Sequence, residues 1–97
     1  MIYLDNNATT ALHPEVFKEM LPFLTSQQGN PASNHTFGRN AHTAIEEARE
    51  KVAASVNAHP SQVIFTSSGT ESNNTIINGI AKAYPDSHFG FSSIEHP

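Results

Sequence analysis

The feature that most limits the fold is a succession of patterns between residues 63 and 93. Val63-Ile64-Phe65 is a short apolar run typical of a buried strand, and a second strand-like run lies around His88 to Ser93. Between the two runs, apolar side chains recur at helical spacing, at Ile76, Ile77, Ile80, Ala81 and Tyr84. Strand, turn, helix and strand in this order predict an α/β unit.

Two further helices are predicted before this unit. Pro14 to Leu24 starts with a proline at a helix-starting position and carries an apolar stripe, and Pro22 is expected to disturb or end it. Phe37 to Ala58 has the strongest helical pattern, with apolar residues at steps of three and four and charged residues on the other side. Asn57 and Pro60 are expected to stop this helix.

Two segments lack a periodic pattern. Ile2 to Leu4 is a short apolar run followed by Asp5-Asn6-Asn7, residues that favour turns, so we expect an arm and not a core strand. Thr25 to Ser33 contains Gly29 and Pro31 and is expected to be a loop.

Size and composition limit the function. A chain of 97 residues matches one domain, so a large enzyme active site is expected to be incomplete in it. A net charge of −4 with only 5 Lys and Arg argues against nucleic-acid and anionic-membrane partners.

No stretch approaches the roughly 20 apolar residues of a membrane span and no secretory signal is visible, so we expect a cytoplasmic location. The sequence has no cysteine, which excludes a disulfide framework or a cysteine nucleophile within these residues.

The turn from Ser67 to Glu71 is the sharpest local signal. Ser68-Gly69-Thr70-Glu71 has capping-box spacing, with Ser68 as the N-cap and Glu71 at the third helical position. Gly69 leaves the backbone uncrowded, and the free N–H groups of the first turn and the Thr70 hydroxyl could receive a phosphate. The pattern alone favours an ordinary capped helix over an anion site, and no P-loop or dinucleotide motif is present.

Histidines and lysines offer few further candidates. His96 follows a predicted strand end and could stack on an aromatic ligand or move a proton, although by itself a surface histidine is the simpler interpretation. His35 follows the loop, and we expect a structural role for it. No histidine pair has metal-ligand spacing with a third ligand, so no metal site is predicted. Lys18, Lys51 and Lys82 are expected on solvated helix faces, and none is a good Schiff-base lysine.

Four motifs follow one another from end to end of the chain. They are Tyr3 to Thr10 (YLDNNATT), Gly29 to Gly38 (GNPAS with His35), Phe65 to Asn74 (FTSSGTESNN) and Glu95 to Pro97 (EHP). In this order and spacing, the chain resembles the amino-terminal part of a cysteine desulfurase. The form SGTES with two following asparagines is more similar to the branch that serves iron–sulfur cluster assembly and tRNA thiolation than to the branch whose turn reads RGTTE.

The resemblance implies an α/β fold, that of class V aminotransferase-type enzymes that use pyridoxal phosphate (PLP), the aspartate aminotransferase-like PLP-dependent transferase fold. Residues 1–97 would form an amino-terminal arm and the start of the large PLP-binding domain, without the rest of that domain or the small domain. The resemblance also implies a homodimer, L-cysteine as the substrate, and a sulfur-acceptor or scaffold protein as a partner.

The resemblance also assigns roles to residues. The backbone at Gly69 and Thr70 would hold the cofactor phosphate, and His96 would stack on the pyridine ring and assist proton transfer. Asn7 to Thr10 would approach the substrate pocket, and Gly29 to Gly38 would lie near the dimer interface. In the complete enzyme, L-cysteine would become L-alanine while an enzyme cysteine takes the sulfur as a persulfide.

The chain alone is expected to be inactive and unstable. The family's Schiff-base lysine and persulfide-forming cysteine, together with its pyridinium-pairing aspartate and carboxylate-binding arginine, would come after residue 97, so more of the same polypeptide would complete the enzyme. Unpaired strand edges would also leave the isolated chain without a stable fold.

Two alternatives stay open at this point. A selenocysteine lyase or another class V enzyme cannot be separated from a desulfurase, because the residues on the substrate side of the site are absent. A free-standing small α/β module that binds an anion or a protein is the alternative outside the enzymes.

Overall fold

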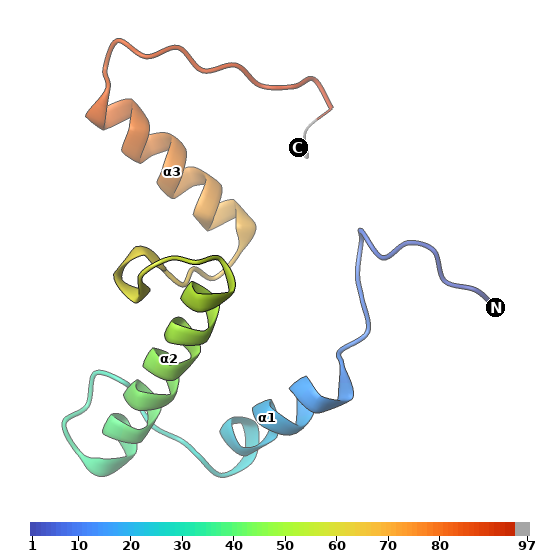
Figure 1. Ribbon diagram of the computed structural model, residues 1–97, viewed down its shortest axis with the longest axis vertical. Coiled ribbons are helices and arrows are strands. Elements are labelled where there is room, and N and C mark those ends of the chain that lie inside the picture. Colours follow the sequence, from blue (N-terminus) through green and yellow to red (C-terminus); the bar gives the residue numbers. More distant parts are fainter. Residues whose placement is uncertain (95–97) are drawn as a thin grey trace. The chain divides into compact units, whose positions relative to one another are not determined.

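The computed structural model of the protein describes residues 1–94 (Figure 1). Within this range the chain forms three α-helices and one short 3-10 helix, and no strand. The elements are α1 (Pro14–Thr25), α2 (Thr36–Ser55), η1 (Pro60–Gln62) and α3 (Gly69–Ala83). The chain divides into two compact units, of which residues 1–63 contain α1, α2 and η1, and residues 64–97 contain α3.

Helix α1 begins at Pro14, as predicted, and runs through Pro22 to Thr25. Pro22 was expected to disturb or end the helix. The helix does not end at Pro22, so that part of the expectation is wrong. Pro22 lies in the last turn, where its missing N–H costs a single helical hydrogen bond. Its own carbonyl accepts the N–H groups of Ser26 and Gln27 at 2.9 and 2.7 Å, which closes the helix three residues later.

Helix α2 begins one residue before the predicted start at Phe37 and ends at Ser55, before the predicted end at Ala58. Asn57 stops it, as predicted, because this residue adopts a left-handed backbone with a φ of 54°. The N–H of Asn57 then reaches the carbonyl of Ala54 at 3.2 Å, and the N–H of Ala58 reaches that of Ala53 at 2.9 Å. This pair of bonds is a Schellman motif, which satisfies the last carbonyls of a helix.

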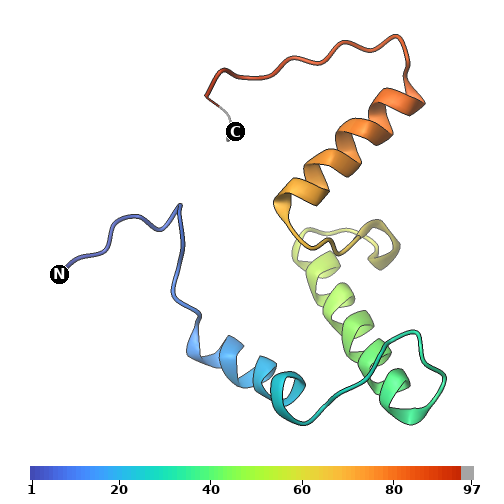
Figure 2. The ribbon, with the colours of Figure 1, turned by 180° about the vertical axis from the view of Figure 1, so that it is seen from behind.

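The short helix η1 folds back against the end of α2, and both views of the ribbon show the two side by side (Figures 1 and 2). Arg49 of α2 donates to the backbone carbonyl of Val63 just after η1, and its guanidinium also pairs with Glu46 at 3.2 Å. Ala53 is 1% exposed and is the one buried hydrophobic residue within residues 1–94. The packed interior of the first unit is therefore very small.

The predicted strands are not confirmed in residues 1–94. The backbone at Val63 is extended, with φ −102° and ψ 123°, but the runs 63–65 and 88–93 form no ladder. The helix expected between them is present, and Tyr84 caps its carboxyl end before a turn at Pro85 and Asp86. A strand exists only where a neighbouring segment supplies hydrogen-bond partners, whereas a helix satisfies its own backbone. The α/β architecture therefore stays an expectation for a larger polypeptide.

No helix within residues 1–94 combines the length and the apolar character needed to cross a membrane.

Candidate anion site at the start of helix α3

Helix α3 starts at the turn that the sequence singles out. Ser68 is the N-cap, with an extended backbone, and its Oγ accepts a hydrogen bond from the Glu71 N–H at 3.2 Å. Gly69 and Thr70 are the first two helical residues, so Glu71 occupies the third position. The predicted helix start and N-cap are confirmed.

The Glu71 side chain reaches one residue further back than a capping box requires. Its Oε2 atom accepts hydrogen bonds from both the N–H and the hydroxyl of Ser67, each at 2.6 Å. In a capping box the acceptor would serve the N–H of the N-cap, here Ser68. We call this pair of bonds the Ser67–Glu71 clamp. The two bonds from Ser67 stabilise the carboxylate and lower the pKa of Glu71 below its ordinary value.

A second link ties the same turn to the next turn of the helix. The hydroxyl oxygens of Thr66 and Ser72 lie 2.6 Å apart, and both side chains are half-buried. Both hydroxyls are also within hydrogen-bond distance of the Ser68 carbonyl, at 3.1 and 3.3 Å. The residues before α3 are therefore held to its first two turns by side chains as well as by the backbone.

The donors left over by these bonds lie at Ser68, Gly69 and Thr70. Among residues 1–94, none of their three backbone N–H groups has an acceptor, and the Thr70 hydroxyl has no partner. All three residues are exposed. Free N–H groups at a helix start carry the positive end of the helix dipole, which favours an anion.

Gly69 keeps this place open. Its φ is not positive, and a Cβ atom built on it would have no heavy atom within 4 Å, so nothing in residues 1–94 requires a glycine there. Gly79 and Gly90 are equally open, so openness alone singles out no site. Gly69 differs from them because it lies among the unpaired donors of the helix start. Two N–H groups, one hydroxyl and an uncrowded backbone fit a phosphate group.

The other sequence-predicted site residues are His96 and the segments Asn7 to Thr10 and Gly29 to Gly38. His96, with Glu95 and Pro97, lies outside the described residues. Asn7 to Thr10 belongs to the first unit, where a turn holds it: the Ala8 N–H donates to the Asp5 carbonyl at 3.1 Å, and the Thr10 hydroxyl donates to the Asn6 carbonyl at 3.2 Å.

The segment Gly29 to Gly38 is a tightly folded loop. A Cβ atom on Gly29 would overlap the carbonyl of Phe37, and a Cβ atom on Gly38 would lie only 2.7 Å from the carbonyl oxygen of Asn30. Both glycines are therefore required by close approach of the backbone. The placement of the Gly29 to Gly38 segment near a dimer interface stays a prediction.

Three histidines act as helix caps, a role that sequence reasoning missed. His13, His35 and His59 are the N-caps of α1, α2 and η1, and each ring Nδ1 atom accepts a backbone N–H at 3.3 Å. The structural role predicted for His35 is confirmed. Histidine is not among the preferred N-caps, but the prolines at 14 and 60 mark two of the helix starts and could have revealed the caps before them.

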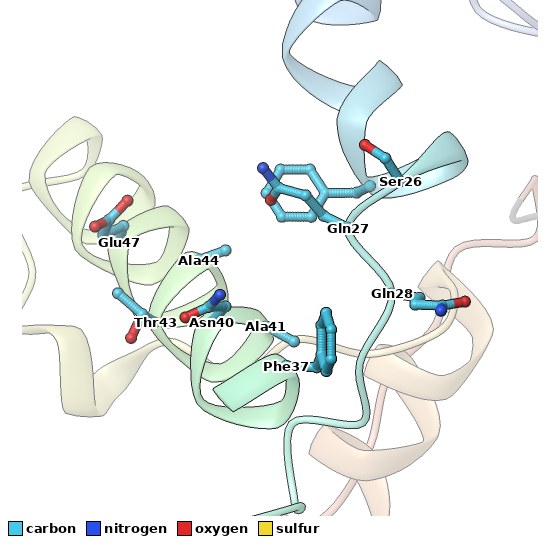
Figure 3. Close-up of a pocket in the computed structure, with 10 residues that line it drawn as sticks. Ser26, Gln27, Gln28, Phe37, Asn40, Ala41, Thr43, Ala44 and Glu47 are labelled. Atoms are coloured by element: carbon cyan, nitrogen blue, oxygen red, sulfur yellow. The ribbon is translucent and has the colours of Figure 1, made fainter. Parts of the chain in front are cut away.

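A separate groove of about 420 Å³ lies in the first unit, between the end of α1 and the beginning of α2 (Figure 3). It is lined by Phe23, Ser26, Gln27, Gln28, Phe37, Asn40, Ala41, Thr43, Ala44 and Glu47. None of these is a predicted cofactor-binding or catalytic residue, although Phe37 belongs to the Gly29 to Gly38 segment, and Glu47 is the one ionisable group among them. In the described part of the chain, no three His, Cys, Asp or Glu residues are grouped to hold a metal ion.

Comparison with known proteins places the chain in a family. The family described as aminotransferase class-V matches residues 2–97. The chain is 52% identical over 97 residues to a protein named cysteine desulfurase IscS from Dictyoglomus turgidum, a match that covers 98% of this chain and 25% of that protein. It is 47% identical over 98 residues to a cysteine desulfurase from Trichormus azollae, which covers 100% of this chain and 24% of the relative.

A third relative, named cysteine desulfurase IscS, from Dechloromonas aromatica, is 54% identical over 84 residues, which cover 86% of this chain and 21% of the relative. The chain thus spans about a quarter of the length of these proteins or less. No solved structure matches it. The resemblance to a cysteine desulfurase is confirmed, and because the family match extends from residue 2 to residue 97, the chain belongs to the aminotransferase class-V family.

Proposed function

We propose that the chain is the amino-terminal part of a PLP-dependent cysteine desulfurase. This enzyme would take sulfur from L-cysteine, release L-alanine and hold the sulfur as a persulfide on one of its own cysteines, for iron–sulfur cluster assembly or thiolation. The observation that carries the proposal is the 52% identity, over 98% of the chain, to a protein named as a cysteine desulfurase. A selenocysteine lyase is not favoured, because the relatives compared above are all named cysteine desulfurases.

PLP is the proposed cofactor, and it would supply the electron sink that allows a bond of the bound amino acid to break. The N–H groups of Gly69 and Thr70, with the Thr70 hydroxyl, would hold its phosphate. The unpaired donors at these two residues support this assignment. His96 is proposed to stack on the pyridine ring and to move a proton through its imidazole.

The remaining groups would come from polypeptide beyond these 97 residues. Lys18, Lys51 and Lys82 are exposed on three different helices, and the sequence contains no cysteine. We therefore propose that the chain alone is inactive, and that the rest of the large domain and a small domain supply the Schiff-base lysine and the persulfide cysteine. A homodimer, a sulfur-acceptor or scaffold protein as partner, and a cytoplasmic location belong to the same proposal and rest on the resemblance.

The test is product formation by the complete polypeptide that carries this chain. Purified with PLP and a reductant, it should release alanine from L-cysteine, with sulfide in equal amount, whereas the 97-residue chain alone should release none. L-Selenocysteine as an alternative substrate separates the two enzyme classes. Alanine formation from L-selenocysteine alone, or from neither amino acid, would overturn the proposed function.

A further inference from the structure

A carboxylate lies at the same helix end that is proposed to hold the phosphate. Glu71 occupies the third position of α3, where the helix dipole favours negative charge, and its side chain is exposed. The carboxylate does not point away into solvent without a partner. It makes the Ser67–Glu71 clamp, in which one oxygen accepts two hydrogen bonds of 2.6 Å.

The clamp divides the donors of the turn into two groups. The N–H and hydroxyl of Ser67 are both used by Glu71, and the N–H of Glu71 is used by the Ser68 hydroxyl. The N–H groups of Ser68, Gly69 and Thr70 stay without acceptors among residues 1–94. An anion at this helix start therefore finds free backbone donors at Ser68, Gly69 and Thr70, and none at Ser67.

The clamp also fixes the backbone that presents these donors. Three residues, among them Gly69 and Thr70, lie between Ser67 and Glu71. The two hydrogen bonds from Ser67 to the Glu71 carboxylate therefore link the two ends of this short segment. Hydrogen bonds to an ionised carboxylate are stronger than neutral ones, and the two bonds from Ser67 lower the pKa of Glu71. Donors fixed before the ligand arrives bind more tightly, because no ordering of the loop is then lost on binding.

We propose that Glu71 is a positioning residue for the cofactor phosphate. It touches Ser67 and not the ligand, and it holds the turn in the form in which the Gly69 and Thr70 N–H groups are free. This inference rests on the proposed function and adds to it a division of roles: Gly69 and Thr70 bind, while Ser67 and Glu71 hold the turn.

The experiment measures binding to the complete polypeptide without bound cofactor. Dissociation constants are determined for PLP and for pyridoxal, which lacks the phosphate, and inorganic phosphate is used to compete with PLP. Glu71→Ala should weaken PLP about tenfold, the order expected when charge-assisted hydrogen bonds that organise a site are lost. Binding of pyridoxal should change less than about twofold, because it makes no use of the phosphate site. Competition by phosphate should weaken together with PLP binding.

Further variants separate positioning from general damage. Glu71→Gln keeps an oxygen acceptor without the charge and should give an intermediate PLP affinity. Ser67→Ala should weaken PLP binding in the wild-type background. In the Glu71→Ala background it should weaken PLP binding little further, because both changes break the same clamp. Glu15→Ala is the matched control, since Glu15 also lies in a first helical turn but its carboxylate has no hydrogen bond within residues 1–94. This control should bind PLP like the wild type.

The outcomes distinguish this inference from the proposed function. Failure of the wild-type protein to bind PLP at all would overturn the proposed function, and with it the role of Glu71. Normal PLP binding by wild type and by Glu71→Ala would overturn the role of Glu71 and leave the function intact. Equal loss of PLP and pyridoxal, or additive effects of Ser67→Ala and Glu71→Ala, would show a general structural defect and would also overturn it. If Glu71→Ala does not fold, Glu71→Gln and Ser67→Ala carry the same comparison.

Discussion

Gly69 is the residue at which a substitution can best test cofactor binding without changing the structure of the turn. A Cβ atom added there would have no heavy atom of another part of the described chain within 4 Å, and the backbone of Gly69 is not left-handed, so substitution should not disturb the turn itself. Any effect of a side chain on cofactor binding would then report on the space that the phosphate needs.

We expect Gly69→Val to lower PLP affinity in the complete polypeptide while helix α3 stays intact. The branched side chain would crowd the backbone where the phosphate approaches its N–H donors. PLP retained after dialysis measures the effect. Gly79→Val, at an equally open position of the same helix, is the control and should retain PLP. Full retention by a folded Gly69→Val protein would count against the assignment of this turn.

His96 is the second residue with a distinct expectation. If its ring stacks on the cofactor and moves a proton, His96→Ala should shift the cofactor spectrum and lower alanine formation by roughly 10²–10⁴-fold. His96→Phe should restore the spectrum in large part but not the turnover, because the phenyl ring stacks without exchanging protons. Wild-type spectra and rates in both variants would make His96 a bystander.

The start of helix α3 should be sensitive to acid. Ser67 lowers the pKa of Glu71 in the folded protein, so the clamp contributes stability above the ordinary glutamate pKa and loses it as the pH falls through the lowered value. We expect the urea midpoint of the complete polypeptide to fall over this range more in wild type than in Glu71→Gln. Parallel pH profiles of the two proteins would contradict the clamp.

The helices could be predicted from the sequence because their signals are local. Pro14, Asn57 and Ser68 each mark a helix end through their own backbone or side-chain preferences, and the structure confirms all three. The strand at 63–65 could not be confirmed in the same way, because a strand needs a partner that residues 1–94 do not supply.

The candidate site could be predicted only in part. The Ser68 cap follows from its spacing to Glu71, and the free N–H groups expected in the first turn are present at Gly69 and Thr70. The bonds from Ser67 to Glu71 could not be foreseen, because the capping-box pattern directs the carboxylate to the N-cap residue. The histidine caps were missed because residue preferences at N-caps assign that role to Ser, Thr, Asp and Asn.

The described part of the chain leaves the apolar stripes of its helices exposed. Large apolar side chains are exposed along the helices, at Val16, Phe17, Met20, Leu21, Phe23, Leu24, Ile45, Val52, Ile76 and Ile80. By contrast, Ala53 is the single buried hydrophobic residue in the described range. Burial of apolar area is the main favourable term in folding. Because so little apolar area is buried, this term does not offset the conformational entropy that the chain loses on folding.

We therefore expect the isolated 97-residue chain to be molten or to aggregate. Heating should give a broad transition or none, and the amide signals of the chain in solution should be poorly dispersed. The complete polypeptide is the control and should unfold cooperatively. A sharp thermal transition with dispersed amide signals from the isolated chain would contradict this expectation and favour a free-standing module.

The proposed function makes this chain one part of a PLP enzyme whose cofactor is bound to a lysine elsewhere in the polypeptide. Borohydride reduction of the complete protein with PLP, followed by peptide mapping, identifies that lysine, because reduction fixes the cofactor to the lysine that holds it. We expect one labelled lysine per polypeptide, outside residues 1–97, and no label on Lys18, Lys51 or Lys82. Specific label on one of these three lysines, or no specific label at all, would contradict it.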